Sequence, residues 1–274
     1  MKIFISVDIE GVAGVSEGLQ GSRGNPEYET ARRLMTAEAS AAVAGAFAGG
    51  ANTVLIADSH GQMRNILADE LDPRARLVAG KPRPLSMAQG LDETYDGVVL
   101  IGYHAGADGY GTLSHTISGL AFRRIEINGV YTNETTLYAG YAAELGVPLL
   151  AVSGDDRLAD EVAEQFPAAR RIVVKQALGA SATDSLSPQA SRQLIEAEVA
   201  AAVKGAATAP VEILSKPPLT VSVLFQHQIQ ADAVALLPFI TRRGPRAIEF
   251  TLGSHREVIG TLSALALIGS AVLR

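Results

Sequence analysis

Short runs of apolar residues alternate with longer segments of helical pattern over the first two thirds of the chain. The apolar runs are nearly continuous in valine, isoleucine and leucine, which is typical of strands buried on both faces of a parallel sheet. This pattern predicts five strands, at Lys2–Asp8, Asn52–Asp58, Asp96–His104, Val147–Asp155 and Arg170–Gln176.

The segments between these runs predict four helices, at Glu27–Ala48, Thr132–Leu145, Asp156–Phe166 and Pro188–Lys204. The last helix has a serine as N-cap, a proline at its first position and a glycine after its end, a common arrangement of helix signals. Because strands and helices alternate, we expect an α/β fold with a mostly parallel sheet flanked by helices and joined by right-handed crossovers.

The pattern changes after Gly205, where a proline-rich segment, ATAPVEILSKPPLT, is typical of a connector. Looser alternation at Thr220–Gln226 and Ala247–Ser254 predicts two more strands, each followed by a helical segment. We therefore expect an α/β catalytic domain over residues 1–208 and a smaller α+β part over residues 209–274.

Composition narrows the classes of partner and ligand. Lys and Arg total 23 against 29 Asp and Glu, for a net charge of −6, so we expect no nucleic-acid partner. The chain has no cysteine, so any metal must be held by oxygen and nitrogen ligands.

The most apolar segment, Val258–Leu273, is shorter than the ~20 residues of a membrane span and predicts a helix in the core or at a subunit contact. With no signal-peptide pattern, we expect a cytoplasmic protein without a membrane partner.

Polar side chains follow the first three predicted strands. Asp8 and Glu10 end the first strand, His60 follows the second, and His104 ends the third. Ligands of open α/β sheets bind at the carboxyl ends of the strands, so these side chains are expected at one edge of one sheet. Two carboxylates that close repel each other unless a cation lies between them, which favours a metal site over a solvated strand end. The spacing alone leaves the fifth ligand and the number of metal ions open.

A glycine-rich loop, Gly102–Gly119, follows the third strand and has His115 near its centre. Glycines in such a loop let the backbone approach a ligand closely. The loop does not match the dinucleotide-binding pattern, and the chain contains neither a serine nucleophile elbow nor a P-loop.

The motifs SVDIEGV, ADSHG, LIGYHAGA, LSHT and SGDDR occur in order between residue 1 and about residue 176. Together they resemble the D-aminopeptidase family of dinuclear zinc peptidases, formerly classed as dipeptide transport proteins. The resemblance implies two Zn²⁺ ions per subunit, with Co or Mn possible, and a homo-oligomeric ring, a decamer, whose active sites face an inner channel.

By this resemblance Asp8 bridges the two ions, Glu10 and His60 complete one metal site, and His104 and Glu134 complete the other. His115 is the implied catalytic residue, either as a nucleophile or, as we favour, as a general base or oxyanion stabiliser. The family tends to have Gly-Glu and then small residues at the last ligand, where this chain has Asn-Glu-Thr-Thr. Glu126 is the alternative carboxylate for that position.

The resemblance implies hydrolysis of the N-terminal residue of short D-peptides of the D-Ala-D-Ala type. One alternative is another dinuclear metallohydrolase, such as a phosphoesterase. Such an enzyme usually has Arg or Lys near its metals, and Arg123 and Arg124 are the basic pair close in sequence to the glycine-rich loop. A second is a peptide-binding component without catalysis.

Among the remaining residues, we expect Asp156 as a helix N-cap, Lys175 as the partner of a buried pair, and His255 at a helix start; His227 is expected on the surface or at an interface.

Overall fold

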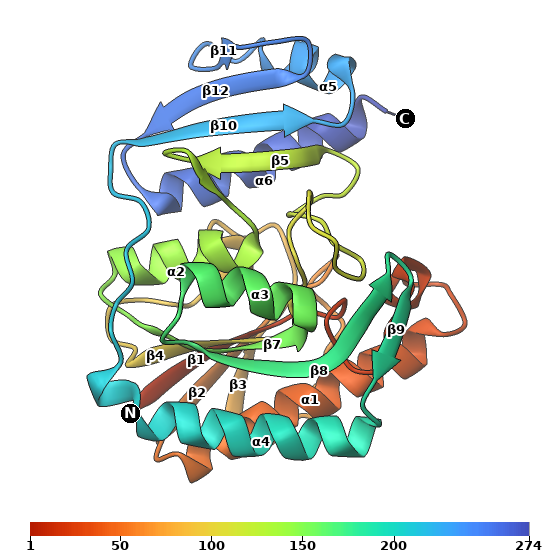
Figure 1. Cartoon of the computed structure of the whole chain (residues 1–274), viewed down its shortest axis with the longest axis vertical. Coiled ribbons are helices and arrows are strands. Elements are labelled where there is room, and N and C mark those ends of the chain that lie inside the picture. Colours follow the sequence, from red (N-terminus) through yellow and green to blue (C-terminus); the bar gives the residue numbers. More distant parts are fainter. Residues whose placement is uncertain (274) are drawn as a thin grey trace.

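The computed structural model describes residues 1–273 and contains two sheets (Figure 1). The larger sheet has seven strands, in the spatial order β3-β2-β1-β4-β7-β8-β9. In chain order they are β1 (Lys2–Val7), β2 (Thr53–Asp58), β3 (Ala75–Val78), β4 (Gly97–Ile101), β7 (Leu149–Asp155), β8 (Arg170–Gly179) and β9 (Ala182–Ser185). All pair in parallel except β8 and β9, which form an antiparallel hairpin.

The smaller sheet is antiparallel and has the order β11-β12-β10-β5-β6. Its strands are β5 (Phe122–Ile127), β6 (Val130–Tyr131), β10 (Leu219–Phe225), β11 (Thr241–Arg242) and β12 (Ala247–Leu252). Two of them therefore come from residues 122–131, within the range expected for the larger domain, and complete a sheet with strands from beyond residue 209.

Helices cover both faces of the larger sheet. The helices of the described residues are α1 (Tyr28–Ala48), α2 (Glu134–Glu144), α3 (Asp156–Gln165), α4 (Pro188–Lys204), α5 (Gln228–Val234) and α6 (His255–Ala271), with short 3₁₀ turns η1 (Gly18–Gly21), η2 (Ser86–Ala88) and η3 (Ala206–Thr208). Of these, α5 and α6 pack against the smaller sheet. Helices α1 and α4 pack together on one face, and α2 and α3 lie on the other (Figure 1). Helix α6 lies between the smaller sheet and α2, so the molecule is built in layers.

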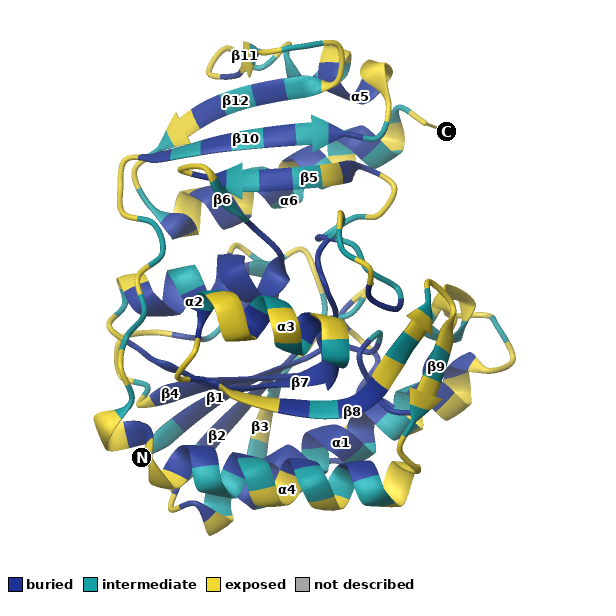
Figure 2. Cartoon of the chain, viewed as in Figure 1, coloured by how far each residue is buried: buried dark blue, intermediate teal, exposed yellow. Residues whose placement is uncertain are grey.

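The alternation of side chains along β1 divides the core in two. Ile3, Ile5 and Val7 point to α1 and α4, whereas Phe4 belongs to a second cluster with α2, α6 and the smaller sheet. Strands β1, β2, β4 and β7 are buried almost throughout, in contrast to the exposed outer sides of α3 and α4 (Figure 2). This double burial explains why these strands read as continuous apolar runs.

The predicted fold class, the strands and the four helices are confirmed, with shifts of a few residues at their ends. The N-cap of α3 is Asp155, whose carboxylate accepts from Leu158 N; the prediction of Asp156 was wrong by one residue. His255 does begin α6 after the N-cap Ser254, and His227 is exposed.

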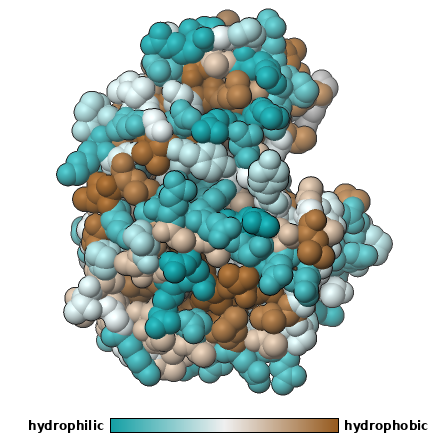
Figure 3. Space-filling view, in the orientation of Figure 1, coloured by the Kyte–Doolittle hydropathy of each residue, from teal (hydrophilic) through white to brown (hydrophobic). Residues whose placement is uncertain are grey.

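Helix α6 contains most of the apolar C-terminal segment, with Val258, Ile259 and Leu262 fully buried. Within residues 1–273, no helix combines the length and apolar composition needed to cross a bilayer. Hydrophilic side chains and small apolar patches share the molecular surface, whose outline is indented between the parts that hold the two sheets (Figure 3).

Candidate metal centre

Three neighbouring strands deliver the first ligands predicted from the sequence. Strand β1 lies between β2 and β4 in parallel register, so their carboxyl ends meet at one edge. Asp8 and Glu10 follow β1, His60 follows β2 and His104 follows β4. The structure brings all four together there, and Glu134 joins them from the first turn of α2.

The imidazole of His60 is oriented by a backbone carbonyl. Its Nε2 lies 2.9 Å from the oxygen of Gly21, which can only accept, so Nε2 carries a proton. In the neutral ring, the lone pair of Nδ1 then points at two carboxylates, at 2.8 Å from Glu10 Oε2 and 3.3 Å from Asp8 Oδ1. A lone pair facing carboxylate oxygens requires a positive charge between them.

His104 repeats this arrangement. Its Nδ1 donates to the carbonyl of Ala105 at 3.0 Å, which leaves Nε2 directed at Asp8 Oδ2 (3.6 Å) and Glu134 Oε2 (3.5 Å). Both Nε2 and Glu134 Oε2 are buried without a hydrogen-bond partner among the described residues. The other oxygen of Glu134 accepts from Ile117 N at 2.6 Å. A ring nitrogen fixed by a carbonyl on its far side is the usual arrangement of a metal-binding histidine.

Asp8 lies between the two imidazoles, with one carboxylate oxygen toward each. Burial raises the pKa of Asp8, but hydrogen bonds with His104 and His60 outweigh it and hold the pKa well below its ordinary value. Burial lowers the pKa of His60 and His104, but the charges of Glu10 and Glu134 and the hydrogen bonds with Asp8 hold both pKa values well above the ordinary value. The carboxylates thus favour a positive charge at these nitrogens, whether a proton or a metal cation.

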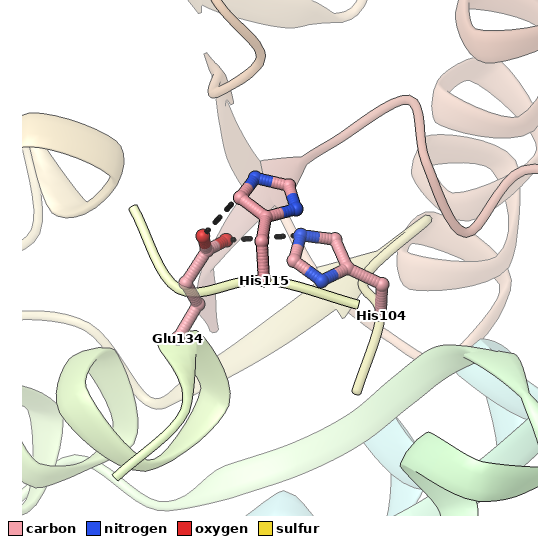
Figure 4. Close-up of side chains that lie close together, drawn as sticks. All are labelled: His104, His115 and Glu134. Atoms are coloured by element: carbon pink, nitrogen blue, oxygen red, sulfur yellow. Dashed lines mark ion pairs between the residues drawn. The ribbon is translucent and has the colours of Figure 1, made fainter. Parts of the chain in front are cut away.

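His115 reaches the same cluster from the glycine-rich loop. Its ring stacks on that of His104, with centroids 4.2 Å apart and planes 13° apart, and its Nε2 lies 3.9 Å from Glu134 Oε1. Figure 4 shows both imidazoles directed toward the carboxylate of Glu134. The Nδ1 of His115 donates to the carbonyl of Leu113 at 2.9 Å, which leaves Nε2 free to accept a proton.

The donor atoms fit a divalent metal. Two overlapping sets of side chains each place one ligand atom per residue within 4.8 Å of the others. These sets are His104, His115 and Glu134, and Asp8, Glu10 and His104. Imidazole nitrogens and carboxylate oxygens are the ligands that Zn²⁺ takes in the absence of thiolates. His60 and Glu126, the alternative carboxylate, belong to neither set. His60 nevertheless lies 2.8 Å from Glu10 and lines the pocket beside the cluster, whereas Glu126 pairs with Arg124 at 2.8 Å and does not line it.

The sequence did not reveal the role of Lys175. Lys175 is buried, as expected, but within residues 1–273 its ammonium forms no ion pair, so the expected buried pair is not formed. Its ammonium instead donates to three backbone carbonyls of the segment after β1, those of Glu10, Val12 and Val15. Burial lowers the pKa of Lys175 to about 8. Lys175 thereby holds the backbone that carries Glu10.

Hydrogen bonds to residues later in the chain hold the loop that contains His115. Asp155 accepts from Thr112 N at 2.8 Å with one oxygen and caps α3 with the other. Leu113 N donates to the carbonyl of Ala180 at 3.0 Å, at the tip of the β8–β9 hairpin. No sequence signal indicated these contacts, because each joins residues more than forty positions apart.

A pocket of about 380 Å³ opens beside the cluster. The cluster side chains that line it are Asp8, Glu10, His60, His115 and Glu134. Helix α6 contributes Ala266 and Leu267 to its wall, so the part with the smaller sheet helps to enclose the site. A bound molecule would therefore touch both carboxylates and apolar side chains.

Comparisons with known proteins identify the family of this chain. The model of the D-aminopeptidase family matches residues 1–264. A D-aminopeptidase of Bacillus subtilis (strain 168) is 37% identical over 239 residues, which cover 87% of this chain and 86% of that protein. The structure of a Zn-dependent D-aminopeptidase from Bacillus subtilis, DppA, described as a self-compartmentalizing protease, superposes with a TM-score of 0.95 at 32% identity and covers 98% of both chains. This chain belongs to the D-aminopeptidase family.

Proposed function

We propose that this protein is a zinc-dependent aminopeptidase that removes the N-terminal residue of short D-peptides of the D-alanyl-D-alanine type. The observation that carries the proposal is the pair of imidazoles whose far nitrogens are fixed by backbone carbonyls and whose near nitrogens face shared carboxylates. Family membership and the likeness to a Zn-dependent D-aminopeptidase support the same reaction.

The proposed ligands are Asp8 shared between two zinc ions, Glu10 and His60 for one ion, and His104 and Glu134 for the other. Zinc, when bound, supplies a Lewis acid for the peptide carbonyl and lowers the pKa of water. An aminopeptidase must also recognise the free amine of a peptide, and either a metal ion or a carboxylate can do so.

His115 is proposed as the general base. With a proton on Nδ1, held by the Leu113 carbonyl, its Nε2 can take a proton from the attacking water and return it to the leaving amine. Stacking on His104 and the hydrogen bond to Leu113 keep the ring in one orientation. A nucleophilic role, implied by the family resemblance, is the alternative for the same nitrogen.

A ring of copies with its active sites toward an inner channel is proposed, because DppA is described as self-compartmentalizing. The proposed number of copies, ten, rests on the family resemblance alone. A cytoplasmic location stays a prediction. For the phosphoesterase alternative, Arg123 and Arg124 pair with Asp108 and do not line the pocket, whereas two other basic residues, Lys81 and Arg83, do.

The test is metal content and release of D-alanine from D-alanyl-D-alanine, measured on the parent and on His115→Ala. We expect about two zinc ions per chain in both proteins and a turnover lower by about 10²–10⁴-fold in the variant, the usual contribution of a general base. His227→Ala, at an exposed histidine, is the control and should match the parent.

A parent without metal would support the peptide-binding alternative. Metal with phosphatase but no peptidase activity would support the phosphoesterase. Turnover retained in His115→Ala would remove this histidine from the chemistry while leaving the rest of the proposal in place.

A further inference from the structure

The pocket beside the metal centre has opposite charges on different parts of its wall. Asp8, Glu10 and Glu134 give it three carboxylates. Among residues 1–273, the lysine and arginine side chains that line it are Lys81 and Arg83, both from the segment between β3 and η2. Because the three carboxylates are the proposed ligands of two zinc ions, Lys81 and Arg83 leave the loaded pocket with a surplus of positive charge, which favours a ligand with an anionic group.

Arg83 is engaged with the protein itself. Its Nη1 donates to the carbonyl of Val78 at 3.2 Å, and its Nη2 donates to the carbonyl of Asp58 at 2.8 Å. These two carbonyls lie at the ends of β3 and β2, so the guanidinium anchors the segment to the same sheet edge that carries the metal centre. Arg83 thereby holds the backbone segment that carries Lys81, two residues earlier in the chain.

Lys81 makes no hydrogen bond or ion pair with any residue of the part of the chain that the structure describes. The residue is exposed, yet burial against the pocket wall lowers the pKa of its ammonium. Large parts of that wall are apolar, with Met63, Met87 and Leu267 among its residues. An ammonium beside apolar surface binds an anion more strongly than one surrounded by water.

We propose that Lys81 binds the C-terminal carboxylate of the peptide substrate and thereby selects for short peptides with a free carboxyl end. The inference rests on the proposed function, since it identifies which end of the peptide meets which part of the pocket. The metal centre is where the N-terminal residue of the peptide is cleaved, and Lys81 pairs with the carboxylate at the other end of the peptide. A volume of about 380 Å³ is near the lower end for small-molecule sites, which suits a peptide of two or three residues.

The experiment compares D-alanyl-D-alanine with its C-terminal amide, which has no negative charge, as substrates of the parent and of Lys81→Gln. For the variant we expect KM to rise about 10-fold with D-alanyl-D-alanine, the loss typical of one charge-assisted hydrogen bond. KM for the amide and kcat for both substrates should stay within about 2-fold of the parent. Lys81→Arg, which keeps the charge, should restore a KM close to that of the parent.

Lys216→Gln is the matched control, because Lys216 is exposed and lies outside the pocket. If KM in Lys81→Gln rises equally for both substrates, or for neither, the inference is wrong and the proposed function stands. If the metal-loaded parent hydrolyses neither substrate, the proposed function fails, and the inference fails with it.

Discussion

The candidate site has two sides that are held in different ways. The strand-end side consists of Asp8, Glu10, His60 and His104, each placed directly after a central strand of the larger sheet. The loop side is His115, in the glycine-rich loop. On the first side a ladder of backbone hydrogen bonds between β1, β2 and β4 sets the positions. On the second, a few bonds to distant segments do so.

Because of this difference, a substitution can affect metal binding, proposed for the strand-end side, without affecting catalysis, proposed for His115, and the reverse. Many backbone hydrogen bonds and a buried core hold the residues of the strand-end side. We therefore expect these proposed metal ligands to keep their positions when a single contact is lost. The loop side depends on the hydrogen bond between Asp155 and Thr112 and on the hairpin contact to Leu113. A single substitution there should displace His115 and leave the metal in place.

Asp8→Asn should have the largest effect, because this carboxylate lies between both imidazoles of the strand-end side. We expect less than half of the parent's zinc content and a turnover lower by at least about 100-fold, since loss of even an indirect metal partner costs about 10–100-fold. Metal per chain by mass spectrometry and D-alanine release are the measurements.

The exposed Asp69→Asn is the control for Asp8→Asn and should retain full metal and activity. After treatment with a chelator, Asp8→Asn should still melt cooperatively but be less stable than the parent, because it loses the buried pairs with His60 and His104. Full zinc content in Asp8→Asn would show that the site is assembled without it.

Asp155→Asn tests the loop side. The Oδ1 atom of the amide can still cap α3, but its NH₂ group cannot accept from Thr112 N, so the bond that holds the loop is lost. We expect kcat to fall about 10–100-fold, the cost of a small misplacement of a catalytic group, with zinc content unchanged. Steady-state kinetics and metal content are measured on the same preparation.

Asp160→Asn, at an exposed position of α3, controls for the change of charge near Asp155. A parallel loss of zinc and kcat in Asp155→Asn would contradict the separation of the two sides. An unchanged kcat would show that the hairpin contact alone holds the loop.

Glu38→Gln addresses the support behind the strand-end side and should have the smallest effect on activity. Glu38 Oε1 accepts from Ala13 N at 3.0 Å and from Ser191 Oγ at 2.6 Å, and burial raises the pKa of Glu38 from 4.5 to about 7. The folded protein therefore binds more protons than the unfolded chain between about pH 4.5 and 7, so this residue's contribution to stability falls as pH rises through that window. Glutamine does not titrate and keeps an acceptor oxygen.

The free energy of unfolding of Glu38→Gln relative to the parent should thus rise by roughly 1–3 kcal/mol between pH 5 and pH 8. Urea denaturation at both pH values measures it, with Glu29→Gln, exposed on the same helix, as the control. A relative stability that does not change with pH would mean that Glu38 does not titrate in this range.

Local pattern predicted the larger sheet well because its strands are buried on both faces and read as apolar runs. The short or half-exposed strands β3, β5, β6, β9 and β11 were not predicted, since their residues carry no such run. β5 and β6 join the smaller sheet only by pairing across the fold, and β5 meets β10 about a hundred residues away. Tertiary packing sets pairing between strands so far apart in the chain, and the local sequence pattern does not indicate it.

The sequence by itself determined which strands end in the proposed metal ligands, because parallel strands bring their carboxyl ends to one edge. It thus indicated Asp8, Glu10, His60 and His104, whereas Glu134 and His115 entered only through the family resemblance. Only the tertiary structure decided which nitrogen of each imidazole faces the carboxylates, since that depends on carbonyls such as Gly21. The same holds for the contacts of Lys175, which join segments that the chain order keeps far apart.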